Sequence, residues 1–155
     1  MAFTHGVFFL LCGITGVFGI CPAGWDQYES KCYKYEAGPD TFDAAELKCT
    51  KILDEAHLVS ISNASEYTFV LSLISAAVGN MSTNTWIGLL DSTTVGPYVW
   101  TDQTNFAFMN FAPGQPSGPR GTEDCVYIEG SNDLWYDNDC TVQNSFVCEG
   151  PLLRP

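Results

Sequence analysis

The sequence has 155 residues and a formal net charge of −12, with 18 acidic residues against six Lys and Arg. This length suits a single domain, and 46% hydrophobic residues can build a packed core, which excludes intrinsic disorder. The acidic balance and the lack of a basic run argue against nucleic acid or an anionic membrane as a partner, because both require Lys and Arg to neutralise phosphate.

Residues 1–19 are predicted to be a secretory signal. An apolar run ends at Ile14, and small residues on either side of Phe18 favour cleavage after Gly19. The run is shorter than the roughly 20 apolar residues that span a bilayer. A buried N-terminal helix or strand is the alternative. We therefore expect residues 20–155 to form a secreted domain, without membrane insertion.

Loss of the signal removes Cys12 and leaves an even number of cysteines. They are Cys21, Cys32, Cys49, Cys125, Cys140 and Cys148. In a secreted chain this count indicates three disulfides, with 15 pairings open. A zinc site is less favoured, since no Cys-x-x-Cys pair is present and His57 lies far from the cysteines in sequence.

Two Asn-x-Ser/Thr sequons fit a secretory route. They place N-glycans on Asn63 and Asn80.

The mature chain begins with a predicted hairpin and a helix. Aromatic residues between turn signals predict a hairpin over Cys21–Tyr35. Pro39 and Asp40 are then expected to open a helix, roughly Thr41–Leu53. Its apolar positions are compatible with one helical face: Phe42, Ala45, Leu47, Cys49 and Ile52.

The second half of the chain combines a helix with short strands. Asn63 precedes Glu66 by three residues, an arrangement close to a capping box, and the helix is expected to stop at Gly79. The predicted strands are Trp86–Leu90, Tyr98–Thr101, Cys125–Ile128 and Ser145–Cys148. The stretch from Asp102 to Thr122 is rich in Gly, Pro and Asn, and a loop of this length is usually functional.

Several motifs follow one another along the mature chain at characteristic spacing. They are Cys21-Pro22-x-x-Trp25-x-x-Tyr28-x-x-x-Cys32-Tyr33, His57-Leu58-Val59-Ser60-Ile61, Trp86-Ile87-Gly88-Leu89, Gln115-Pro116-Ser117, Glu123-Asp124-Cys125-Val126, Trp135-x-x-x-x-Cys140 and Phe146-x-Cys148-Glu149. In this order they resemble the C-type lectin domain. Each motif is weak alone, but together they are specific and cover essentially the whole mature sequence.

The resemblance implies an α+β fold of the C-type lectin-like kind. Two helices would pack on small antiparallel sheets, with a long-loop region and three disulfides. It also implies one set of pairings: Cys21–Cys32, Cys49–Cys148 and Cys125–Cys140.

The resemblance further implies a calcium site that binds sugar. In sugar-binding members, one calcium ion in the long-loop region is coordinated by protein oxygens and by two sugar hydroxyls. Carried over to this sequence, the ion's ligands are Gln115, Ser117, Glu123 and Asp137, and Tyr136 joins them in the carbohydrate site. In family members, the peptide bond that precedes the proline between the first two ligands is cis.

Two positions depart from the family pattern. Ser117 stands where the family has Asp or Asn, and Tyr136 stands where it has Asn. A serine hydroxyl reaches less far and a phenol is a poor calcium ligand, so we expect one weakly bound ion, with a Kd of roughly 10⁻⁴–10⁻³ M. Asn138 or Asp139 could substitute for Tyr136.

An auxiliary calcium site is not expected. Asp91 and Asp124 match its positions, but Val95 and Gly118 replace the other acidic ligands.

The sugar preference rests on two conflicting features. Gln115 resembles the galactose-type Gln-Pro-Asp motif more than the mannose-type Glu-Pro-Asn. However, Ser117 is followed by Gly118-Pro119-Arg120-Gly121, with neither the insertion nor the aromatic residue of galactose-type members. We favour galactose or N-acetylgalactosamine, on a glycan of a cell or microbial surface.

Two other classes of function are the alternatives to a calcium-dependent lectin. A C-type-lectin-like module with a degenerate calcium site would bind a protein, lipid or mineral surface through the same loops. An enzyme is not expected, because no catalytic triad or phosphate-binding loop is present, and Glu123 and Asp137 are already accounted for as ion ligands.

Oligomerisation would raise the avidity for a glycan surface, although no coiled coil is visible in the sequence. Trp86, Trp100 and Trp135 are expected in the core.

Overall fold

The computed structural model describes residues 19–79, 82–91, 98–117, 121 and 124–154. The predictions for residues 1–18 and for Asn80, Val95, Gly118 and Glu123 therefore lie outside the described residues.

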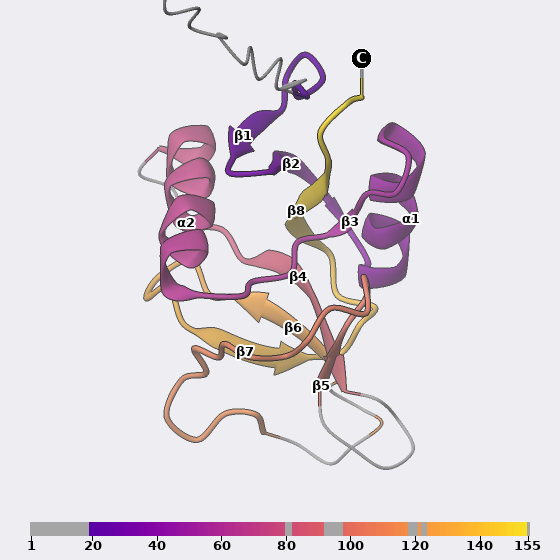
Figure 1. The fold of residues 1–155 in the computed structure, drawn as a ribbon. Coiled ribbons are helices and arrows are strands. Elements are labelled where there is room, and N and C mark those ends of the chain that lie inside the picture. The colour runs from indigo at the N-terminus through magenta and orange to yellow at the C-terminus, as the bar shows by residue number, and fades with distance from the viewer. Residues whose placement is uncertain (1–18, 80–81, 92–97, 118–120, 122–123, 155) are drawn as a thin grey trace, which may run out of the picture.

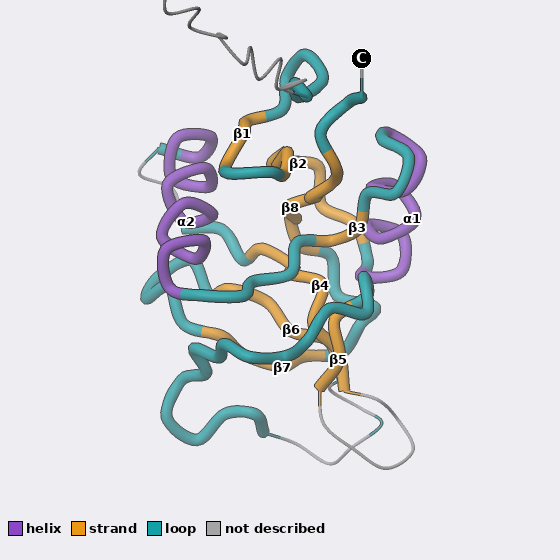
Figure 2. Tube along the Cα trace, in the orientation of Figure 1, coloured by secondary structure: helices purple, strands orange, loops and turns teal. Residues whose placement is uncertain are grey.

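Two helices stand on either side of a set of strands (Figures 1 and 2). The helices are α1 (Phe42–Ile52) and α2 (Ala64–Val78). The strands are β1 (Asp26–Tyr28), β2 (Lys31–Asp40), β3 (His57–Leu58), β4 (Thr85–Asp91), β5 (Tyr98–Trp100), β6 (Cys125–Ile128), β7 (Trp135–Asn138) and β8 (Asn144–Pro151). The α+β fold is confirmed.

The strands form one continuous sheet in the order β1-β2-β8-β4-β6-β7, with β3 on β8 and β5 on β4. All pairs are antiparallel except β4 and β8, which run parallel through Thr85–Ser145 and Trp86–Phe146. This parallel pair joins the half of the sheet that carries the C-terminus to the half that carries the long loop. The C-terminus and the long loop lie at opposite ends of the molecule (Figure 1).

The first helix has the predicted bounds, with Thr41 and Leu53 as its caps, but its buried face differs from the prediction. Pro39 and Asp40 end β2 rather than open the helix, at a point where the register with β8 shifts and a missing N–H is tolerated. Phe42, Ala45 and Cys49 are buried, whereas Leu47 and Ile52 are 53% and 39% exposed. Leu47 lies two residues from both Ala45 and Cys49, which puts it on the opposite side of a helix with 3.6 residues per turn.

The second helix begins and ends as predicted. Asn63 Oδ1 accepts hydrogen bonds from the backbone N–H groups of Ser65 and Glu66 at 2.9 and 3.0 Å. The Glu66 carboxylate reaches back to the N–H of Ser62, at 2.8 Å, rather than to that of Asn63. Gly79 then follows with a φ of 64°, a conformation that glycine adopts without strain.

The predicted strands and core tryptophans are confirmed. The four predicted strand segments correspond to β4, β5, β6 and β8, and only Thr101 lies outside its strand. The side chains of Trp86, Trp100 and Trp135 are at most 2% exposed. Strand β7 was not predicted as a strand.

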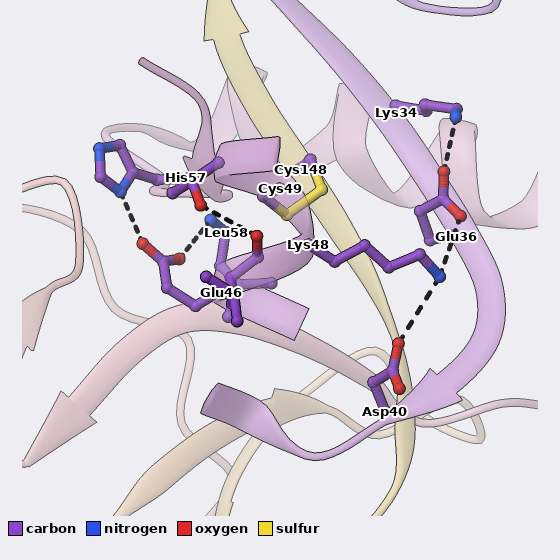
Figure 3. The surroundings of a disulfide bond; sticks show 11 residues. Lys34, Glu36, Asp40, Glu46, Lys48, Cys49, His57, Leu58 and Cys148 are labelled. Atoms are coloured by element: carbon purple, nitrogen blue, oxygen red, sulfur yellow. Dashed lines mark hydrogen bonds and ion pairs between the residues drawn. A yellow bond between two sulfur atoms is a disulfide. The ribbon is translucent and has the colours of Figure 1, made fainter. Parts of the chain in front are cut away.

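The disulfides pair as the resemblance implies: Cys21–Cys32, Cys49–Cys148 and Cys125–Cys140. Figure 3 shows the second of these, which joins α1 to β8.

Polar contacts hold α1 on both sides of this disulfide (Figure 3). Glu46 accepts a hydrogen bond from the backbone N–H of Leu58 at 2.8 Å and lies 2.6 Å from Nδ1 of His57. Lys48 lies 3.6 Å from carboxylate oxygens of both Glu36 and Asp40, at the end of β2. These contacts connect α1 to β2 and β3 independently of the disulfide.

Candidate functional site

The long loop after β5 folds on an aromatic base. The rings of Phe108 and Phe111 lie edge-on to Trp135, with centroids 5.7 Å away in each case, and Phe106 packs against Trp100 at 6.1 Å. Edge-to-face pairs of this kind add stability beyond the area that they bury. The loop is therefore anchored to β5 and β7 by side-chain packing.

Backbone hydrogen bonds continue this anchoring toward the predicted ligands. The Ala112 N–H donates to the carbonyl of Trp135 at 3.0 Å, and the Gln115 N–H donates to the carbonyl of Ala112 at 2.9 Å. The peptide between Gln115 and Pro116 is cis, as the resemblance implied. Ser117 is thereby brought to β7.

Ser117 and Asp137 are in direct contact. Asp137 Oδ1 accepts a hydrogen bond of 2.9 Å from the Ser117 backbone N–H and one of 3.4 Å from its hydroxyl. Asp137 belongs to β7 and is only 7% exposed. Two of the four predicted ion ligands, twenty residues apart, thus meet at one point.

Gln115 supplies an unsatisfied oxygen. Its Oε1 is buried and has no hydrogen-bond partner among the described residues. A buried acceptor without a partner destabilises the fold by about 1–3 kcal/mol unless a ligand or ion satisfies it. Calcium prefers carboxylate, amide and hydroxyl oxygens, so the donor set of Gln115, Ser117 and Asp137 fits a calcium ion.

Asp137 is the one acidic residue of this set within the described structure. Across the described part of the chain, no group of three or more His, Cys, Asp or Glu side chains is arranged to hold a metal. Glu123 lies outside that part. The described donors alone would bind calcium weakly.

Tyr136 points away from Asp137. Adjacent side chains of a strand face opposite sides, and the Tyr136 ring stacks on Tyr127 with a centroid distance of 5.9 Å. Its hydroxyl accepts a hydrogen bond from Asn132 Nδ2 at 2.9 Å. The structure does not bring Tyr136 together with Ser117 and Asp137, and its role in sugar binding stays a prediction.

The two residues that could substitute for Tyr136 are engaged in a local turn. Asn138 Oδ1 accepts from the N–H of Asp139 at 2.8 Å. Asp139 Oδ1 accepts from the N–H and hydroxyl of Thr141 at 2.8 and 2.7 Å.

Asp91, at the end of β4, is a neighbour of Asp124, which directly precedes β6. The Asp91 N–H donates to the Asp124 carbonyl at 2.7 Å, and Asp124 Oδ1 accepts from the N–H of Gly121 at 2.8 Å. The other two positions of the auxiliary site lie outside the described residues.

The comparisons with known proteins agree with this architecture. The family model described as "Lectin C-type domain" matches residues 38–150. The chain belongs to the C-type lectin domain family. It is 35% identical to the snaclec stejaggregin-A subunit alpha of Trimeresurus stejnegeri over 148 residues, covering 94% of this chain and 90% of the subunit.

Two further similarities bear on this C-type lectin domain. It is 31% identical to the alpha-N-acetylgalactosamine-specific lectin of Patiria pectinifera, over 81% of this chain and 77% of that lectin. The crystal structure of human lithostathine superposes with a TM-score of 0.77 and 30% identity, over 84% of this chain and 90% of the other. Two longer relatives, both receptors, are matched over only 37% and 45% of their own lengths.

Membership confirms the predicted class of function, because C-type lectin domains are binding proteins rather than enzymes. Among the described residues, no helix has the length and apolar character required to cross a membrane.

The aromatic base of the loop was not singled out from the sequence. Its signal was present as the closely spaced Phe106, Phe108 and Phe111 in a stretch otherwise poor in large apolar residues. A polar loop without an aromatic base would not hold Gln115 and Ser117 against β7.

Proposed function

We propose that this C-type lectin domain binds carbohydrate through one weakly held calcium ion at Gln115, Ser117, Glu123 and Asp137. The observation that carries the proposal is the buried, unpartnered Gln115 Oε1 in the loop that Ser117 joins to Asp137. Bound calcium would supply coordination positions for two neighbouring sugar hydroxyls.

The protein's own residues orient the sugar. The Gln115 carboxamide both donates and accepts hydrogen bonds, so it can pair with a hydroxyl in either sense. Asp137 accepts only, and its two bonds from Ser117 fix the direction of its carboxylate.

The sugar is proposed to be of the galactose or N-acetylgalactosamine type. Gln115 before the cis proline supports this preference, as does the similarity to a lectin named for N-acetylgalactosamine. The length of the loop after Ser117 favours mannose instead, so the preference needs a direct competition.

Retention on immobilised N-acetylgalactosamine tests the proposal. We expect the mature domain to be retained in millimolar calcium, released by EDTA, and displaced by free galactose at about tenfold lower concentration than by mannose. The double variant Gln115→Glu/Ser117→Asn should reverse this order, because it recreates the mannose-type motif.

Asp26→Asn provides the control. It removes an exposed carboxylate in β1, at the opposite end of the domain, and should leave retention unchanged. Retention that persists in EDTA, or displacement by mannose ahead of galactose, would contradict the proposal.

A calcium-independent binding module is the second candidate. The observation that favours it is that the N–H and hydroxyl of Ser117 both donate to Asp137, which gives this buried carboxylate partners without an ion. In that case the same loops would bind a protein, lipid or mineral surface, and EDTA would have no effect.

We further propose that the domain is secreted and carries N-glycans. Its three disulfides form in an oxidising compartment. Asn63 is exposed at the start of α2, and Asn80 follows shortly after this helix. Display of several copies on one surface would compensate for weak binding to a single glycan on a cell or microbe.

A further inference from the structure

A buried serine lies between two carboxyl groups. Ser60 Oγ is 2.6 Å from Asp102 Oδ2 and 2.6 Å from Glu149 Oε1. Ser60 and Glu149 are 4% and 5% exposed. Glu149 belongs to β8, and Asp102 begins the long loop just after β5. One hydroxyl therefore bridges the last strand and the loop.

Asp102 and Glu149 cannot both be ionised in this arrangement, because Ser60 has too few protons for both contacts. A serine hydroxyl has one proton to donate and lone pairs that accept. If both acids were ionised, one of the two 2.6 Å contacts would bring oxygen lone pairs together without a proton between them. Contacts this short are typical of O–H···O⁻ hydrogen bonds. One of the two acids must therefore donate to Ser60.

The surroundings identify Glu149 as that acid. Asp102 Oδ1 accepts from the N–H and hydroxyl of Thr104 at 2.9 and 2.7 Å. Although burial raises the pKa of Asp102, hydrogen bonds from Ser60, Thr104 and Glu149 prevail and leave this pKa below its ordinary value. Burial raises the pKa of Glu149 to about 7, despite the opposing attraction of Lys31.

We propose that Glu149 is protonated in the folded domain and donates to Ser60, which donates to Asp102. The order is Glu149 Oε1–H to Ser60 Oγ, then Ser60 Oγ–H to Asp102 Oδ2. These two hydrogen bonds connect the start of the long loop to β8, and the connection weakens when Glu149 loses its proton. The inference rests on this geometry and not on the proposed sugar site.

The neighbouring charges do not remove the need for this proton. Lys31 Nζ lies 3.0 Å from Glu149 Oε2 but also 3.4 Å from Glu66 on α2. Glu66 has donors of its own, since Tyr33 on β2 donates to it at 2.6 Å. The Lys31 ammonium is thus shared between Glu66 and Glu149. Neither of these two ion pairs includes Asp102.

A pocket of about 270 Å³ borders the cluster. Its lining residues are Ser30, Lys31, Glu55, His57, Asp102, Glu149, Gly150 and Pro151. The pocket gives water access to the buried proton. It also places His57 and Glu55 near enough to require control variants in any pH experiment.

The expected pH dependence follows from the raised pKa of Glu149. The folded domain keeps a proton that the unfolded chain releases, so this stabilisation is complete below the unfolded carboxyl pKa of about 4.3. It is lost as the pH rises through about 7. The melting temperature of the mature, disulfide-bonded domain should therefore fall by roughly 9 °C between pH 5 and pH 8.5.

Glu149→Gln tests the proposal directly. The glutamine amide can donate to Ser60 at every pH while its oxygen still accepts from Lys31, so the fall in melting temperature should disappear. Carbon-13 NMR of the wild-type Glu149 carboxyl should show a midpoint near 7. The Thr104 amide signal, which reports on Asp102, should shift with the same midpoint.

Glu66→Gln is the matched control. The pKa of Glu66 lies below its ordinary value because hydrogen bonds from Ser62 and Tyr33 outweigh the opposing effect of burial. This variant should lose stability equally at pH 5 and pH 8.5. In His57→Gln and in Glu55→Gln, the Glu149 carboxyl should keep its midpoint near 7.

If Glu149→Gln does not fold, Asp102→Asn replaces it. An asparagine amide can donate to Ser60, so the Glu149 midpoint should drop by at least one pH unit. A wild-type midpoint between 4 and 5, or the same fall in melting temperature in Glu149→Gln, would overturn the proposal.

Discussion

Replacing Cys49 and Cys148 together by alanine is expected to lower the free energy of unfolding by about 4–5 kcal/mol. This disulfide closes a loop between residues 99 positions apart. Its removal mainly raises the conformational entropy of the unfolded chain. The folded state changes less, because the contacts of Glu46 and Lys48 in Figure 3 still hold α1 against β2 and β3. Denaturant unfolding with the other two disulfides intact measures the loss.

Cys21→Ala/Cys32→Ala is the matched comparison. That disulfide joins residues 11 positions apart, for which the chain-entropy model gives about 3 kcal/mol. The two double variants should differ by about 2 kcal/mol. Equal losses would show that native-state contacts, rather than loop length, determine the contribution of each disulfide.

Trp135→Ala is expected to lower the free energy of unfolding by about 3–5 kcal/mol. Trp135 is fully buried and touches the rings of Tyr67, Trp100, Phe108 and Phe111. The truncation leaves a cavity where the core meets the long loop. Because Asp137 lies two residues further along β7, ligand binding should weaken as well. Thermal unfolding and retention on immobilised sugar measure the two effects.

Met109→Ala is the control for this variant. Met109 lies in the same loop but is 64% exposed, so its removal should change stability by less than about 0.5 kcal/mol. The loss of stability in Trp135→Phe should lie between the losses in Met109→Ala and Trp135→Ala, since phenylalanine keeps one aromatic ring against the loop. A loss below about 1 kcal/mol for Trp135→Ala would contradict the role of this residue as the anchor of the loop.

Elements with a strong local pattern were predicted correctly from the sequence. Helix α2 has a capping asparagine and a terminal glycine, and both act as expected. Strand β7 has no such pattern, because polar Asp137 is buried on the same face as Trp135. Recognition of β7 would also have placed Tyr136 on the face opposite Asp137.

Contacts between distant segments were not predictable from the sequence. The side of α1 occupied by Leu47 depends on where the sheet lies, which the apolar pattern of that short helix does not define. Ser60 meets Asp102 and Glu149 across 42 and 89 residues, and no local signal links them. The disulfide pairing and the ligand positions came from the family resemblance rather than from spacing.

Calcium titration of the mature domain by calorimetry, after treatment with EDTA, shows directly whether this domain binds the ion. We expect one ion per chain with a Kd of roughly 10⁻⁴–10⁻³ M. Asp137→Ala should abolish the heat, whereas Asp26→Ala, at the other end of the fold, should preserve it. A folded domain that gives no heat up to about 10 mM calcium would contradict calcium-dependent sugar binding and favour a calcium-independent module.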